Sequence, residues 1–136
     1  MKTIEDLWPE DLVRMDIPSP KEILIEQANY LTERTKNLLV GEVKTSAVMI
    51  KNEGENYINH EFIIKAPFMG NYQFVLLKVA HKLSIYPLTI TDELNEESFV
   101  IYDEGEFKRT LAQILRSKLV KDAINSLVGR IGYSSI

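Results

Sequence analysis

The amino-acid sequence predicts an α+β domain, a mostly antiparallel meander of about five strands with a long helix before it and two short helices after it. Apolar residues recur every three or four positions over residues 19–42 and alternate with period two over 45–103. They return to helical spacing over 104–129. The length of 136 residues suits a single domain, residues 1–136, in which residues 1–18 form an N-terminal arm.

Residues 19–42 carry the signals of a helix start followed by an amphipathic stripe. Ser19 can cap the helix, Pro20 suits its first position, and Glu22 stands where a capping box needs it. The stripe consists of Ile23, Leu24, Ala28, Leu31, Thr35, Leu38 and Leu39. We therefore expect a helix of about 20 residues that ends near Gly41.

The pattern over 45–103 predicts strands joined by short turns. The first two turns are "NEGE" (52–55) and "PFMGN" (67–71). The third strand, 72–83, is apolar at both alternations, which predicts a central strand with something packed on each face. Its expected faces are Phe74 and Leu76 on one side, and Val75, Leu77 and Val79 on the other. "IYPLTIT" contains Pro87, which indicates an edge or a bulge, and "SFVIYD" is the last strand.

Two helices are expected after the sheet. Asp103 and Glu106 repeat the capping pattern, and a stripe through Phe107, Leu111, Ile114 and Leu115 follows. A second stripe through Val120, Ile124, Leu127 and Val128 is out of phase with the first. The phase changes at Ser117, a residue that commonly caps helices, so two short helices are predicted and not one.

The two histidines of the chain, His60 and His81, are the first candidates for chemistry. His60 precedes a glutamate, but the zinc-protease pattern His-Glu-x-x-His fails because Ile64 stands four residues later and the local period is two. A hairpin turn about residues 70–71 would place the two histidines directly opposite each other on one face. We expect both to be structural.

The alternative is a small enzyme or a ligand- or metal-binding domain centred on His60 and His81, with Tyr72 as a third ligand-binding candidate. The paired acids of "DELNEE" (92–97) and "DEGE" (103–106) are expected in exposed turns and at helix starts, with no catalytic role. No nucleophile or phosphate-binding motif stands out. We therefore predict no catalytic residue, no metal and no cofactor, and we favour a protein that is not an enzyme.

Charge and composition limit the classes of partner that the protein is expected to bind. A net charge of −4 argues against general nucleic-acid binding, and the basic segment 107–136 is expected to be the solvated face of a helix. No run of 18 apolar residues predicts a membrane span, and the lack of cysteine fits a reducing cytoplasm. Trp8 is expected to anchor the arm onto the domain, or else to be an exposed contact for a protein partner. Because both faces of the third strand look apolar, we predict a homodimer, with Phe74 in the contact.

The stretches "PSPKEILIEQANYLTERTKNLLVGEV" and "EGEFKRTLAQILRSKLVKDAINSLV", with a strand ending in "YP" between them, resemble small uncharacterised bacterial proteins. The resemblance implies no activity and assigns no functional residue. The expected function is a non-enzymatic protein-binding or regulatory module of a bacterial cell or phage.

Overall fold

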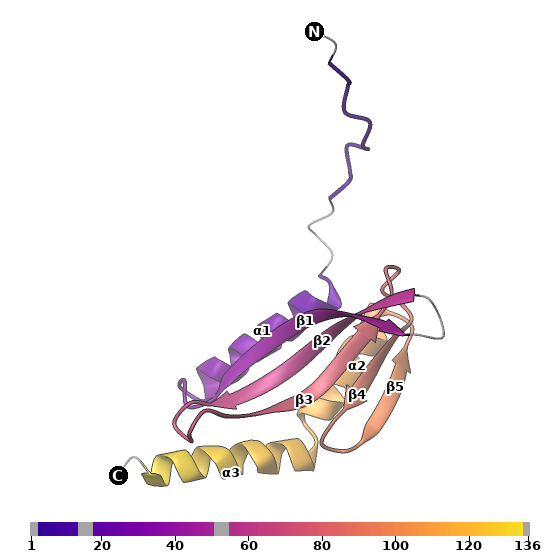
Figure 1. Cartoon of the computed structure of the whole chain (residues 1–136). Helices are drawn as coiled ribbons and strands as arrows, with labels where there is room; N and C mark the ends of the chain where they lie inside the picture. The colour runs from indigo at the N-terminus through magenta and orange to yellow at the C-terminus, as the bar shows by residue number, and fades with distance from the viewer. Residues whose placement is uncertain (1–2, 14–17, 51–54, 135–136) are drawn as a thin grey trace.

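The computed structural model describes residues 3–13, 18–50 and 55–134, and within them it confirms the predicted α+β class (Figure 1). Five antiparallel strands pair in the order β1-β2-β3-β4-β5, so every strand lies beside its neighbour in the chain. The elements are α1 (Pro20–Arg34), β1 (Val40–Ile50), β2 (Glu55–Ala66), β3 (Tyr72–His81), β4 (Leu88–Asp92), β5 (Glu97–Ile101), α2 (Glu104–Leu115) and α3 (Lys118–Ser134). Most of the predicted "NEGE" turn lies outside the described residues.

Helix α1 begins as predicted but ends early. The Ser19 hydroxyl accepts a hydrogen bond from the Glu22 N–H at 3.2 Å, which satisfies one of the free amides at the helix start. The helix has 15 residues and stops at Arg34, so the expected length of about 20 residues is wrong.

The early end of α1 has a local cause. The Thr35 hydroxyl donates to the Leu31 carbonyl at 3.0 Å, and the Leu39 N–H donates to this hydroxyl at 3.1 Å. Lys36 and Asn37 have positive φ angles of 51° and 67°, a conformation that typically terminates helices. The chain therefore turns here and enters β1, with Leu39 fully buried in the core from the turn and not from the helix.

A β-bulge changes the side-chain phase of β3. Phe62 lies opposite Leu77, whereas Ile63 lies opposite Val75, so Leu76 is the extra residue. Beyond the bulge, Phe74 lies opposite Ile64, on the same face of the sheet as Leu77. The predicted division of these side chains between two faces is therefore wrong.

The helices cover one face of the sheet. In Figure 1, α1 lies behind β1 and β2, α2 lies behind β4 and β5, and α3 runs along the lower side. This inner face carries the core residues Phe62, Ile64, Leu77, Val79 and Ile90.

The outer face of the sheet is largely polar. A row of paired residues crosses it, made of Lys44, Glu61, Lys78, Thr91 and Ser98. Apolar side chains are scattered over the same face, among them Val48, Ile63, Val75 and Val100. Because this face does not need an apolar cover, the argument from two apolar faces to a homodimer fails, and the oligomeric state stays a prediction.

The turn between β4 and β5 is held by one buried acid, Asp92, the last residue of β4. Asp92 is 2% exposed, and its Oδ1 accepts hydrogen bonds from the N–H groups of Leu94 and Asn95 at 3.1 and 3.0 Å. Its Oδ2 accepts from the Asn95 Nδ2 at 2.8 Å. The expectation of an exposed turn holds for Glu93, Glu96 and Glu97 but is wrong for Asp92, which organises the turn.

The C-terminal helices divide where the sequence predicts. The Glu106 N–H donates to Asp103 Oδ1 at 2.8 Å and caps α2, and the Ser117 hydroxyl accepts from the Val120 N–H at 3.5 Å as α3 begins. Helix α3 has 17 residues, more than α1, so the expectation of a short last helix is wrong.

Candidate functional site

His60 and His81 meet on the inner face, with their Nε2 atoms 2.9 Å apart. His60 lies opposite Val79 and His81 lies opposite Ile58, so the pair is diagonal and not directly opposed as predicted. The hairpin is centred near Met69, and the bulge moves the register by one further residue. Both rings are buried, with 4% and 7% of their surface exposed.

Each ring nitrogen of the pair has a hydrogen-bond partner. His81 Nδ1 lies 2.7 Å from the Lys82 carbonyl, and His60 Nδ1 lies 2.9 Å from the Thr45 hydroxyl. Because a carbonyl only accepts, His81 carries its proton on Nδ1, and its neutral Nε2 accepts from His60 Nε2–H. His60 Nδ1 then accepts from Thr45. The tautomers are inferred from this network, and they give one continuous chain of bonds.

The surroundings keep His60 neutral. Burial, with smaller contributions from His81 and Lys21, lowers the pKa of His60 from 6.5 to about 4. Protonation of His60 would add a proton at Nδ1, where the ring now accepts the hydrogen bond of the Thr45 hydroxyl at 2.9 Å, so this bond would have to reverse its direction. The pair is therefore built for the neutral form of His60.

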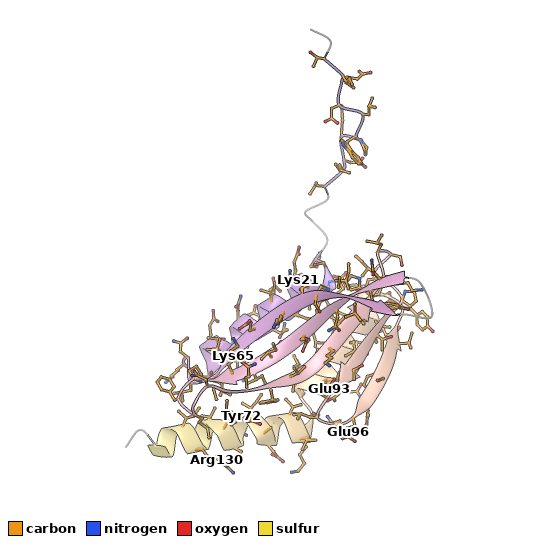
Figure 2. The ribbon with its side chains drawn as sticks, viewed as in Figure 1. Lys21, Lys65, Tyr72, Glu93, Glu96 and Arg130 are labelled. Carbon is orange, nitrogen blue, oxygen red and sulfur yellow. The ribbon has the colours of Figure 1, made fainter. Side chains whose placement is uncertain are left out.

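The third ligand-binding candidate does not join the histidines. Tyr72 stands nine positions before His81 on β3, which is about 30 Å at the rise of a strand. Figure 2 shows Tyr72 near Arg130 of α3. Lys21, whose charge contributes to the lowered pKa of His60, lies far from both, towards the opposite end of the sheet. Among the described residues, no group of three or more acidic or imidazole side chains is placed to hold a metal ion.

Tyr72 and Phe74 instead line a hollow of about 520 Å³ between β3 and α3, together with Leu127 and Arg130. Phe74 is half-buried and packs against the core, with its ring centroid 6.0 Å from that of Tyr72. This position gives Phe74 a role in packing, and its predicted role in partner binding stays a prediction.

A larger groove, about 990 Å³ in volume, lies between α1 on one side and α2 and α3 on the other. Its floor is the buried Phe62, Ile64 and Leu76. Apolar side chains that are only partly buried form its walls, among them Leu31, Leu115, Ile124 and Val128. Its charged lining residues are four bases, Arg34, Lys108, Arg116 and Lys121, and one acid, Glu26.

The packing of the helices explains why the part of the sheet that forms the floor of the groove is not covered by a helix. A Cβ on Gly41 would lie 2.6–2.8 Å from atoms of Ala28, so glycine allows α1 to lie directly against β1. The Gly41 N–H also donates to the Thr32 hydroxyl at 3.0 Å. Helix α2 follows β5 after two residues and covers the opposite half of the sheet. The groove therefore has parts of β2 and β3 as its floor.

The N-terminal arm, residues 3–13, projects away from the domain (Figure 1). Trp8 is 71% exposed, so the prediction that it anchors the arm is wrong, and its role in partner binding stays a prediction. The other large apolar side chains of the arm are also exposed, namely Ile4, Leu7, Leu12 and Val13. They alternate with the acids Glu5, Asp6, Glu10 and Asp11.

Sequence reasoning missed both the groove and the amphipathic character of the arm. Ile4, Leu7, Trp8 and Leu12 stand at spacings of three, one and four, a signal that was present in the sequence. The basic rim could not be predicted from the sequence in the same way, because its residues come from separate elements. Arg34 lies in α1, Arg116 directly follows α2, and Lys121 lies in α3.

No family model, curated protein or solved structure that was compared with the chain matches it. In the parts of the chain that the structure describes, no helix has the length and apolarity needed to cross a bilayer.

Proposed function

We propose that this protein is a non-enzymatic protein-binding module whose groove receives an amphipathic, acidic segment of a partner protein. The supporting observation is the groove between α1 and α2–α3, with its apolar walls and basic rim. Amphipathic helices commonly bind in such a groove with their apolar side inward. A reducing cytoplasm suits a chain without cysteine.

The charges of the groove argue for an acidic partner segment. The chain as a whole carries −4, yet four bases and one acid line the groove. Lys108 is in part engaged, since its Nζ lies 3.5 Å from Glu104 Oε1. Arg34, Arg116 and Lys121 are exposed at the rim, where charges chiefly raise association rates and select partners of opposite sign.

The alternative, a ligand- or metal-binding domain centred on His60 and His81, has less support. All four ring nitrogens of the pair are already engaged, two of them with each other. A metal ion would have to break the bond between the Nε2 atoms and find further ligands. The groove needs no such rearrangement to receive a ligand.

Peptide selection on the full chain tests the proposed function. A phage-displayed peptide library is panned on the immobilised protein, and the selected peptides are synthesised with a fluorescent label. Fluorescence polarisation then measures their affinity for the protein and for the rim variant Arg116→Glu/Lys121→Glu. We expect selected peptides with apolar residues at helical spacing between acids, and an affinity at least 10-fold weaker for the variant.

A double substitution of equal charge on two exposed lysines that do not line the groove, Lys44→Glu/Lys82→Glu, serves as the control. It should leave the affinity within about twofold, because exposed charges beyond the Debye length are screened. Selected peptides that bind the rim variant as tightly as the unchanged protein would contradict the proposed function.

A further inference from the structure

The N-terminal arm has the chemistry that the groove selects. Residues 3–13 carry four acids and no base, and five large apolar side chains that are more than half exposed. The groove offers partly buried apolar walls and four bases. An exposed cluster of apolar side chains of this kind commonly marks a binding surface.

The arm begins to form a turn in the structure. The Leu12 N–H donates to the Pro9 carbonyl at 3.2 Å, and the Trp8 N–H donates to Asp6 Oδ1 at 3.0 Å. Proline suits the first turn of a helix, so the segment after Trp8 can extend this turn when it binds. Trp8 and Leu12, which stand four residues apart, would then lie on one side of the helical turn, as binding to the groove requires.

The length of the arm matches the groove. Pro18 and Thr35 both line it, so the groove runs along the whole of α1, which is about 22 Å long at the rise of a helix. Eleven residues in extended form reach about 36 Å, and a partly helical arm still covers most of the groove. No described residue of the arm lines the groove of its own chain, and the arm leads away from α1 (Figure 1).

We propose that residues 3–13 of one copy bind in the groove of a second copy, and that the reciprocal exchange of arms forms a two-fold dimer. This proposal rests on the proposed function of the groove. A two-fold exchange is closed, because each copy supplies one arm and one groove. It also places the dimer contact in the arm and the groove, away from Phe74.

The single tryptophan of the chain makes the test direct, since Trp8 lies in the arm. Sedimentation velocity and tryptophan emission are measured on the full chain from nanomolar to high micromolar concentration. We expect a shift from monomer to dimer, and a blue shift of the emission over the same concentration range. The single substitution Leu7→Asp, at a side chain 80% exposed, should weaken the dimer at least 10-fold.

Leu83→Asp is the matched control, because Leu83 is 91% exposed and lies outside both arm and groove. It should leave the dimer unchanged. Charge exchange then identifies the surfaces. Glu10→Lys/Asp11→Lys in the arm and Arg116→Glu/Lys121→Glu in the groove should each weaken the dimer at least 10-fold, and the two pairs combined in one chain should restore it.

A chain that sediments as a monomer throughout overturns the proposal, including a monomer whose tryptophan emission is already blue-shifted, which would show that the arm binds within its own chain. A dimer that is insensitive to Leu7→Asp overturns it as well. Peptide binding to the groove is measured separately, so the groove can prove to be a binding site even if the exchange of arms fails.

Discussion

His60 and His81 connect β2 to β3 through one hydrogen bond between their Nε2 atoms, 2.9 Å long, on the covered face of the sheet. Replacing His60 with Gln should reduce the free energy of unfolding by about 1–2 kcal/mol, because the ring bonds to Thr45 and His81 are lost. Urea denaturation at pH 7.5 measures this, with the exposed Lys44→Gln as control. Stoichiometric zinc that disappears in the His60 variant would contradict a structural role.

The stability should depend on pH through the same ring. The pKa of His60 is lowered from 6.5 to about 4 by burial, His81 and Lys21, so the unfolded chain binds more protons between these values. The contribution is complete above pH 6.5 and is lost as the pH falls towards 4, by up to about 3 kcal/mol. The free energy of unfolding is measured against pH for the unchanged chain and for His60→Gln, and the difference between the two profiles gives the contribution of His60. A difference that is flat between pH 7 and 4 would exclude this linkage.

Gly41→Ala tests the close contact of α1 with β1. A Cβ at this position would lie 2.6–2.8 Å from Ala28, so α1 must move, at a cost of about 1–3 kcal/mol. The control is Gly129→Ala in α3, where no atom lies within 4 Å of the added Cβ. It should stabilise the chain by about 0.5–1 kcal/mol, because alanine favours helix. Equal effects at the two sites would contradict the packing described here.

Of the four acids at the turn between β4 and β5, we expect only one, Asp92, to contribute substantially to the stability of the fold. Asp92→Ala removes the acceptor of three hydrogen bonds in a buried position and should cost about 1–3 kcal/mol. Changing Glu93, Glu96 and Glu97 to Gln should shift the stability within about 0.5 kcal/mol per site. Glu93 lies 3.8 Å from Lys78, but exposed pairs of this kind contribute little. Thermal unfolding of both variants compares them directly.

The sequence predicts elements better than it predicts their contacts. Ser19, Asp103 and Ser117 marked helix starts correctly, because a cap depends on residues within one turn. The bulge at Leu76 left no comparable sign, because alternating and continuous apolar patterns both suit a strand that carries it.

The candidate sites also depend on contacts that the sequence predicts only in part. The histidines were expected to be neighbours, and they are, but on a diagonal that depends on the bulge and on the position of the turn. The groove was not predicted at all, because its rim comes from separate helices and exists only once these are packed on the sheet.

The order of strands in the sheet also bears on how the chain folds. Five residues join β2 to β3 and four join β4 to β5, so each pairing closes a short loop at a small entropic cost. Chains dominated by such local contacts fold faster than chains of similar size with distant pairings. The groove needs α1 and the two C-terminal helices in place together, although about 70 residues separate Arg34 from Glu104. We therefore expect the hairpins to acquire hydrogen-exchange protection early and the walls of the groove to acquire it last.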